Sequence, residues 1–548
     1  MASFTVARSC GVIVAALLVL LPAGAYAANP STVQKQIDEL QRAVDEQKAQ
    51  LATQQRMLEQ QAAIIEQLKK ESAGDSAEEA NAKALADIQK KLDEQKLKQQ
   101  EAPKVAMSNG RPTISSSDGR YTFSPRAVVQ FDMAKHGDGV EGPLASDYRR
   151  GSVGGAGNRE TNAARDLSNS AYFRRARFGF EGTLARDWDY RVLLELGGSG
   201  TEGPTRINDA YVIYSGFAPF RFQLGAFSPP ANMDDGTSVE DSLLIERATP
   251  AELSRTLGGA DGRIGLGVRS GGKRWMGALT FTSRTVNDAE VFDSQFAALG
   301  RFGYLAATSS DYNIHVGANA THVFQPPDAG SSAAGARYGI RFRDRPEIRV
   351  DSTRLIDSNT IDADSAYSAG VEFGANYKNF FMQAENFWYG ISRRAPSTLD
   401  DPSFEGYYVE GSWLITGESR RYNMTNGSFQ GPKALKPFSG KKGGPGAWEL
   451  ALRFSHTDLN FHEGSDGTAA AADSVRGGVQ DILSFGVNWY PISNLKFMLN
   501  VLHIDVDRLN PAGPGNLTPF GPAPGTPPIG VDIGQDLNVY ALRSQFAF

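Results

Sequence analysis

Apolar and polar residues alternate at every second position in segment after segment between Tyr121 and Phe548. In "WDYRVLLEL" (188–196) both aromatic residues and all the aliphatic residues but Leu193 share one parity, and the charged side chains share the other. Successive side chains of a β-strand point to opposite faces, so this period predicts strands with one apolar and one polar face. The pattern recurs at residues 171–184, 220–227, 263–269, 367–377, 380–389, 448–456, 480–490, 495–503 and 537–548.

The N-terminus carries an export signal. An apolar run, "GVIVAALLVLLPAGAYA" (11–27), ends in a small-x-small pattern, which predicts a signal peptide cleaved after Ala27. No later stretch approaches the length of about 18 apolar residues that a spanning helix needs. The chain is therefore expected to be a soluble secreted β-protein or a membrane β-barrel. Its single cysteine, Cys10, lies inside the signal. Disulfides, thiolate metal sites and cysteine nucleophiles are thus excluded from the mature chain.

Strand length and connection length favour the barrel. A segment as long as "YFRRARFGFEGTL" (172–184) suits a tilted crossing of a bilayer, and aromatic residues gather at segment ends, as an interfacial girdle requires. The terminal Phe548 resembles the insertion signal of bacterial outer-membrane proteins. Short connections (184–187 and 491–494) alternate with long ones rich in Gly and Pro (135–170, 228–260, 325–365 and 505–535). The expected fold is an all-β transmembrane barrel of about sixteen antiparallel strands, with fourteen or eighteen as alternatives.

A helical segment is predicted in front of the barrel. Residues 31–70 are rich in Gln, Glu, Lys and Ala, and their aliphatic residues fit one heptad frame with three glutamines at core positions. This indicates an N-terminal α-helical coiled coil; the alternative is a single solvated helix acting as a spacer. The predicted organisation is a signal peptide (1–27), a periplasmic helical segment (28–104), a linker (105–120) and an outer-membrane barrel (121–548).

The barrel region uses arginine rather than lysine. After residue 110 there are 35 arginines and 8 lysines, although the whole chain has a formal net charge of −6. Arginine presents a planar, permanently charged fork that suits phosphate and carboxylate oxygens. Arg175, Arg177, Arg191 and Arg221 have the polar parity of their strands, which predicts that they face the lumen.

A second group of arginines lies in one long connection. "ARYGIRFRDRPEIRV" (336–350) places five arginines within thirteen positions, and Arg341, Arg343 and Arg345 fall at every second residue, so an extended chain would point these three to the same side. If this loop folds into the pore, the five arginines provide successive weak sites for an anion, as conduction requires. Alternatively, they bind lipopolysaccharide phosphates or pair with Asp344 and Glu347. The five residues are Arg337, Arg341, Arg343, Arg345 and Arg349.

Several blocks together resemble one family. "NSAYFRRARFGFEGTLARDWDY", "INDAYVIYSGFAPFRFQLGAF", "GAWELALRFSHTDL" and "FGVNWYPISNLKFMLN" are similar, in the same order, to the phosphate-selective porin O/P family. The resemblance implies a trimer of sixteen-stranded barrels that pass phosphate or polyphosphate through an arginine-lined pore. It assigns Arg174 and Arg175 to the paired constriction arginines and Arg126 to a lumen arginine. It assigns Asp209 to an acidic constriction residue and Arg247 to an arginine after the constriction loop.

Two departures reduce the positive charge along the expected route. The constriction loop reads "NMDDGTSVED" (232–241), with acidic residues where the family has lysine, and the barrel is poor in lysine near its periplasmic end, where it offers His503. Both changes count against high-affinity phosphate selectivity more than against anion preference.

The predicted function is passive diffusion of small anions, such as phosphate and pyrophosphate or polyphosphate, across the bacterial outer membrane. No enzymatic activity, cofactor, metal or nucleic-acid partner is expected; the expected partners are outer-membrane lipid, lipopolysaccharide and two further copies of the chain. One alternative is a broad-specificity porin, including a sugar channel with Phe227, Phe381 and Phe387 as an aromatic track. Others are an outer-membrane hydrolase, for which the six scattered histidines form no recognisable motif, and a structural tether with a plugged barrel.

Overall fold

The computed structural model describes two units of the chain, residues 1–102 and 103–548. Described within them are residues 63, 86–94, 96–97, 102–108, 110–137, 140–141, 167–198, 205–288, 292–330, 336–351, 353–439, 443–511, 530 and 532–548. In the first unit, residues 63, 86–94 and 96–97 are helical. The predicted signal peptide and, apart from residue 63, the predicted heptads lie outside the described residues. Among the described helices, none has both the length and the apolar composition to cross a bilayer.

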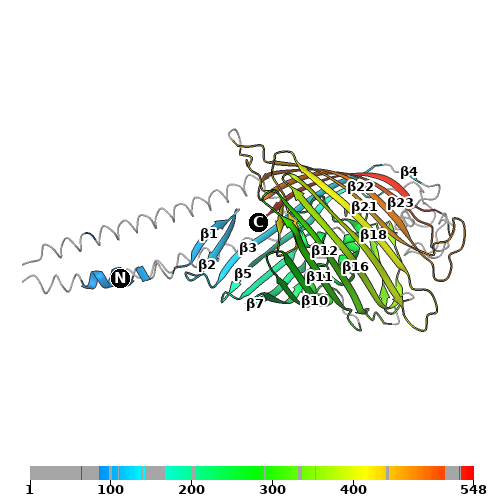
Figure 1. Cartoon of the computed structure of the whole chain (residues 1–548), viewed down its shortest axis with the longest axis horizontal. Coiled ribbons are helices and arrows are strands. Elements are labelled where there is room, and N and C mark those ends of the chain that lie inside the picture. Colours follow the sequence, from blue (N-terminus) through cyan, green and yellow to red (C-terminus); the bar gives the residue numbers. More distant parts are fainter. Residues whose placement is uncertain are drawn as a thin grey trace, which may run out of the picture. The chain divides into compact units, whose positions relative to one another are not determined.

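The second unit is built around a closed antiparallel barrel of sixteen strands (Figure 1). Each strand pairs with its neighbours along the barrel, and the last strand pairs with the first through Phe546↔Val129 and its neighbours. The predicted strand segments fall within these strands, except that 188–196 and 537–548 each extend one residue beyond the observed strand. The strands of the barrel are β3 (Thr122–His136), β5 (Ser170–Leu184), β6 (Trp188–Glu195), β7 (Arg206–Phe217), β8 (Phe220–Phe227), β9 (Arg263–Gly271), β10 (Trp275–Thr285), β11 (Phe296–Thr308), β12 (Tyr312–Gln325), β16 (Ile361–Tyr377), β17 (Phe380–Arg393), β18 (Ser403–Leu414), β21 (Ala447–Phe461), β22 (Val475–Ile492), β23 (Leu495–Asp507) and β24 (Gln535–Ala547).

The connections differ between the two ends of the barrel. At the end where β3 begins and β24 ends, most strands are joined by tight turns, such as 185–187 and 378–379. The opposite end carries long connections, as predicted. One connection at the short-turn end breaks the rule, because residues 415–446 between β18 and β21 contain β19 (Arg421–Asn423) and β20 (Ser428–Gln430). A hairpin of β1 (Lys104–Ser108) and β2 (Arg111–Ser115) precedes the barrel and extends the sheet beside β3.

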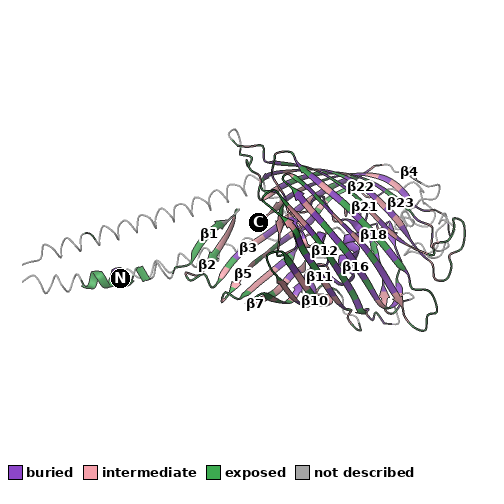
Figure 2. Ribbon diagram, in the orientation of Figure 1, coloured by how far each residue is buried: buried purple, intermediate pink, exposed green. Residues whose placement is uncertain are grey.

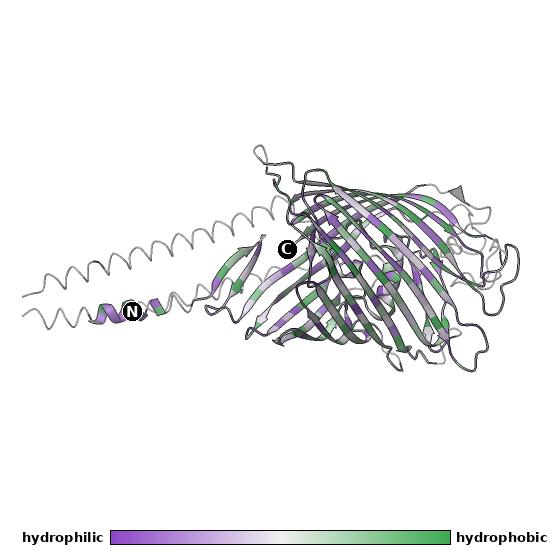
Figure 3. Ribbon diagram, viewed as in Figure 1, coloured by the Kyte–Doolittle hydropathy of each residue, from purple (hydrophilic) through white to green (hydrophobic). Residues whose placement is uncertain are grey.

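Alternation along the strands separates an apolar outer face from a polar inner face. Burial alternates residue by residue along the barrel (Figure 2), and hydropathy alternates with it (Figure 3). Apolar side chains on the outward parity are exposed, including Leu224, Leu266 and Phe281. Single exposed apolar residues are ordinary on a soluble protein, but a continuous apolar band around a closed sheet requires a nonaqueous surrounding. The barrel exterior is therefore a lipid-facing surface.

An arginine placed on this outer face is expected to destabilise the folded barrel. Leu224 lies on β8 with 60% of its surface exposed, beside outward-facing Val212 and Leu266. Leu224→Arg should cost about 2–4 kcal/mol, because the guanidinium loses its hydration in the hydrocarbon layer. Urea titration of folding into phospholipid vesicles measures this cost. The equally drastic change Phe292→Arg, at a position 77% exposed in a long connection, is the control and should cost little. Equal effects of the two substitutions would contradict a lipid-facing β8.

Three connections fold into the barrel. The first, residues 228–262, contains α4 (Met233–Gly236) and α5 (Thr249–Gly258). The second, residues 326–360, contains β13 (Gly339–Ile340), β14 (Arg343–Asp344) and β15 (Ile356–Asp357), and the third is 415–446. Apolar residues of α5 and of 340–356 pack against inward-facing residues near the long-loop ends of β16 to β24. The hydrophobic cluster that holds these connections therefore lies inside the barrel. Buried polar side chains fill much of the remaining interior.

Candidate functional site: an arginine cluster inside the barrel

A β-bulge turns two consecutive arginines to the same side of β5. The register between β3 and β5 shifts between Gln130↔Arg175 and Phe131↔Phe173, so Arg174 is the extra residue. Strict alternation would place Arg174 on the same face as outward-pointing Phe178. A bulge re-aims a side chain, and here Arg174 and Arg175 are both buried inside, with 6% and 4% exposed.

Both arginines lie beside Glu246, which comes from the 228–262 connection. Arg174 makes a bidentate pair with it, with Nε–Oε1 at 2.7 Å and Nη2–Oε2 at 3.1 Å. Arg543 of β24 donates from Nη2 to Oε1 at 3.0 Å, and Arg349 Nε lies 3.4 Å from Oε2. We call Arg174, Arg175, Arg349, Arg543, Glu246 and Asp132 the Glu246 cluster. Four guanidinium groups and two carboxylates leave a local excess of positive charge.

Asp132 and the amides beside it complete the wall of the cluster. Asp132 of β3 accepts two hydrogen bonds from Arg543, each at 2.7 Å. Gln130 accepts one from Arg175 Nη1 at 2.6 Å and donates to Gln545 at 2.7 Å. Among the described residues, Arg175 has no carboxylate partner, and its Nε makes no hydrogen bond. Arg175 is therefore the member of the cluster that is best able to bind an incoming anion.

Anchors on the barrel wall hold the connection that carries Glu246. At its start, the carboxylate of Glu385 accepts hydrogen bonds from the backbone N–H groups of Met233 (2.9 Å) and Asp234 (3.0 Å), which are orphan donors at the beginning of α4. Further on, the Tyr389 hydroxyl donates to the Pro250 carbonyl at 2.6 Å. Glu246 itself is held by its backbone, whose carbonyl accepts from Arg453 at 3.0 Å.

Glu246 stays ionised in this environment. Burial by itself raises the pKa of a carboxyl group, but Arg174, Arg543 and Arg175 together hold the pKa of Glu246 well below its ordinary value. The cluster thus contains a permanent internal anion. A carboxylate and a phosphate oxygen present the same kind of acceptor to a guanidinium fork, so Glu246 occupies part of the surface that a passing anion would use.

The other residues assigned by the resemblance also lie beside side chains of opposite charge. Arg126 pairs with Glu240. Asp209 lies 3.7 Å from Arg191. Arg247 lies 3.5 Å from Asp234 and 3.6 Å from Asp235. Three of the acidic residues that replace lysine in the 232–241 stretch, Asp234, Asp235 and Glu240, are thus partners of interior arginines, with Asp235 also bound by Arg255. These pairs neutralise part of the positive charge of the interior arginines.

The five arginines of 337–349 do not form one continuous row. β14 ends at Asp344, so the alternation that exposes Arg341 and Arg343 stops there and Arg345 is buried. Arg337 pairs with Asp328 at 2.6 Å and Arg341 pairs with Asp357. Arg349 contacts the carboxylates of Glu246 and Glu252. Packing of Ile340 and Phe342 into the hydrophobic cluster breaks up the row that the local spacing predicts.

Other interior contacts were not predicted from the sequence. The inward parity of "YALRSQFAF" identifies Arg543 once the strand is recognised. The 415–446 connection gives no such signal, yet it is fastened to the wall by Arg301, which donates to the carbonyls of Asn426 (2.6 Å) and Gly427 (2.8 Å) and pairs with Glu372 (2.8 Å). It also reaches the first connection, because Ser428 Oγ donates to the Gly236 carbonyl at 2.8 Å.

The aromatic residues considered for a sugar track are packed inside. Phe227, Phe381 and Phe387 are 1%, 6% and 0% exposed. The ring of Phe381 is tilted against that of Phe429 of β20 with centroids 5.1 Å apart, and Phe387 stacks on Tyr389 with centroids 6.2 Å apart. They are covered by protein and do not present a surface to a solute.

Comparison with known proteins identifies the family of this chain. Residues 149–516 match the family described as phosphate-selective porin O and P. A protein of Caulobacter vibrioides without an assigned function is 26% identical over 423 residues, which cover 76% of this chain and 74% of that protein. Porin O of Pseudomonas aeruginosa is 24% identical over 424 residues, covering 74% and 88%. Among solved structures, a loop-deletion mutant of the Vibrio cholerae outer-membrane protein OmpT aligns with a TM-score of 0.42 and 10% identity, over 78% of this chain and all of that one. The family match spans more than half of the sequence, and the chain is an outer-membrane porin that belongs to the phosphate-selective porin O and P family.

Proposed function

We propose that this porin passes small anions, phosphate and polyphosphate among them, by passive diffusion past the Glu246 cluster. The observation that carries the proposal is the convergence of four guanidinium groups from β5, β24 and the 326–360 connection on one region inside the barrel. The similarity to Porin O supports it.

Energetics favour an anion over a cation at this position. Two unit charges about 4 Å apart interact by about 1 kcal/mol in water and about 4 kcal/mol at an effective dielectric constant near 20. The excess positive charge of the cluster acts in this intermediate range. It attracts an anion and repels a cation, and its internal carboxylates keep the site shallow enough for the anion to leave.

The test is the reversal potential of single channels in a planar bilayer with a potassium chloride gradient. We expect the sign that corresponds to anion preference, and we expect millimolar phosphate to reduce the chloride current because it competes for the same guanidinium groups. A reversal potential of cation-selective sign would contradict the proposal.

A broad-specificity porin is the second candidate, because most other interior arginines are already neutralised. Arg177–Glu195, Arg301–Glu372 and Arg420–Glu449 are pairs with N–O distances of 2.7, 2.8 and 2.7 Å. If such pairs only balance the interior charge, the channel is nearly unselective and phosphate does not reduce its current. The same bilayer recording thus separates the two candidates.

For the assembly we propose a homotrimer in contact with lipopolysaccharide, as in the family that the chain resembles. Native mass spectrometry of the detergent-extracted protein should give three chains per particle. A monomer at all protein concentrations would contradict this part of the proposal.

A further inference from the structure

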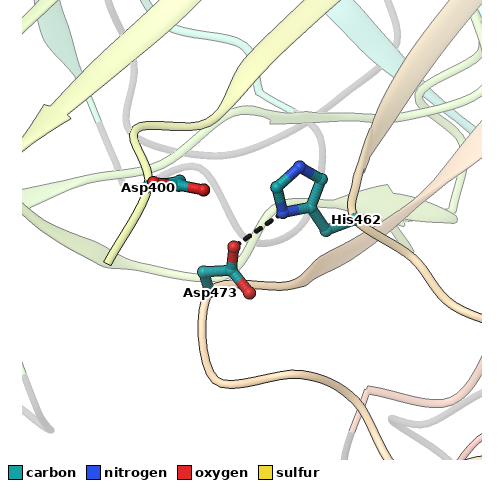
Figure 4. Close-up of side chains that lie close together, drawn as sticks. All are labelled: Asp400, His462 and Asp473. Carbon is teal, nitrogen blue, oxygen red and sulfur yellow. Dashed lines mark hydrogen bonds and ion pairs between the residues drawn. The ribbon is translucent and has the colours of Figure 1, made fainter. Parts of the chain in front are cut away.

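Three metal-binding side chains meet between two connections at the long-loop end of the barrel. Asp400 lies in the connection between β17 and β18, and His462 and Asp473 lie in the connection between β21 and β22. One ligand atom from each side chain is within 4.8 Å of the other two. Figure 4 shows the imidazole of His462 and the two carboxylates grouped around a common space, with Asp400 facing the His462–Asp473 pair.

The surrounding backbone positions these side chains. Arg393, the last residue of β17, donates from Nε to the Asp400 carbonyl and from Nη2 to the Asp473 carbonyl, both at 2.9 Å. One guanidinium therefore ties the two connections together. His462 has a φ of +46°, and its ring stacks on Phe461 with centroids 3.9 Å apart. The left-handed backbone turns the chain immediately after β21, and the stacking restricts the plane of the imidazole.

The charges of the group are incompletely compensated. Asp473 Oδ2 lies 2.6 Å from His462 Nδ1. The side chain of Asp400 has no hydrogen-bond or ion-pair partner among the described residues. The guanidinium of Arg393 contacts main-chain carbonyls, and the two carboxylates and the imidazole surround a common space (Figure 4). A cation in this space relieves the repulsion between the two carboxylates.

We propose that Asp400, His462 and Asp473 form a binding site for a divalent transition-metal ion of the Zn²⁺ class. An imidazole nitrogen with two carboxylate oxygens suits Zn²⁺ and similar ions, whereas Ca²⁺ and Mg²⁺ take oxygen ligands. Zinc–ligand distances of about 2.0–2.2 Å place tetrahedral ligand atoms about 3.4 Å apart, so His462 Nδ1 and Asp473 Oδ2, now 2.6 Å apart, must separate by side-chain rotation to admit the ion between them. The ion takes the place of the hydrogen between His462 and Asp473, and the neutral imidazole then carries its hydrogen on Nε2, so no net proton is released. Solvent fills the fourth position.

Bound metal would link the two connections over this end of the barrel. The ligands belong to segments that Arg393 already holds together, so the ion adds a second cross-link at the same place. The site is partly exposed and has three protein ligands, and the positive charge of Arg393 is close. We therefore expect micromolar affinity rather than the tighter binding of a closed structural zinc site.

Calorimetric titration of the full-length, tag-free porin in detergent micelles tests the proposal, with ZnCl₂ as the probe. We expect one saturable Zn²⁺ site per chain that weakens at least about tenfold in both His462→Ala and Asp400→Asn, because each removes one of three ligands. The same titration with CaCl₂ should show no comparable site.

His456→Ala is the matched control. His456 Nδ1 also lies 2.6 Å from a carboxylate oxygen, that of Asp481, but this pair has no third ligand among the described residues. The control should bind Zn²⁺ as the unmodified protein does. Absence of zinc binding in the unmodified protein, or equal affinity in His462→Ala, overturns the proposal. Co²⁺ provides an independent readout, since its visible absorption should intensify on tetrahedral binding and should not do so in His462→Ala.

Discussion

A channel with Arg174→Ala and Arg175→Ala is expected to lose its anion preference and its block by phosphate together. The substitutions remove two of the four guanidinium groups in the Glu246 cluster and leave both of its carboxylates, so the local excess of positive charge disappears. Interactions of about 4 kcal/mol per charge pair at 4 Å are large compared with the 1.4 kcal/mol of a tenfold change in affinity. Phosphate block should therefore weaken at least about tenfold, and the reversal potential in a chloride gradient should move toward zero or change sign.

Two further variants distinguish the effect of positive charge in the Glu246 cluster from the loss of an arginine elsewhere and from the loss of the planar guanidinium. Arg221→Ala removes an arginine of β8 that pairs with Asp189 at 2.7 Å, with 41% of its side chain exposed, and it should change selectivity little. Arg174→Lys/Arg175→Lys keeps the charge but lacks the planar fork, so it should retain anion preference and lose part of the phosphate block. Unchanged block in the double alanine variant would show that the Glu246 cluster is not on the anion route.

Glu246→Gln is expected to have the opposite effect and to strengthen phosphate block about tenfold. Glu246 is the carboxylate that Arg174, Arg543 and Arg349 share, and it competes with any anion that enters the cluster. Glutamine has the same shape and keeps an oxygen that can accept from Arg174, but it removes one negative charge. Even a fraction of the roughly 4 kcal/mol of a close charge pair accounts for a tenfold gain in affinity. Concentration-dependent block of single-channel current measures the change.

Glu240→Gln is the matched control for this experiment. Glu240 lies in the same connection, and its partner Arg126 is outside the Glu246 cluster, so the same chemical change should alter phosphate block less. Weaker block in Glu246→Gln would mean that Glu246 serves to position the arginines rather than to compete with the anion. Circular dichroism of both variants verifies that the barrel is folded.

The strands were predictable from the sequence because their signal is local. A two-residue period records which side chains face lipid and which face the interior, and a misplaced charge on the lipid side is costly. Segments such as 380–389 and 495–503 lie within observed strands, and the tight turn at 185–187 falls where it was expected. The same parity correctly assigns Arg175 and Arg177 to the interior.

Strand alternation fails to predict which side chains face inward where a strand is irregular or absent. It places Arg174 on the lipid face, and the bulge on β5 moves it inside. It predicts one row for Arg341, Arg343 and Arg345, whereas β14 ends before Arg345 and the row breaks. In both cases the outcome depends on pairing and packing with distant segments.

Local patterns in this chain are sufficient to establish an outward apolar face and an inward polar face that carries many arginines. They do not reveal which charges meet. Glu246, Arg349 and Arg543 are far apart along the chain and become neighbours because two connections fold back into a closed barrel. Their positions follow from contacts such as Met233 with Glu385 and Pro250 with Tyr389, which form on folding. The balance between free and neutralised arginine, and with it the selectivity we propose, is therefore a property of the folded interior.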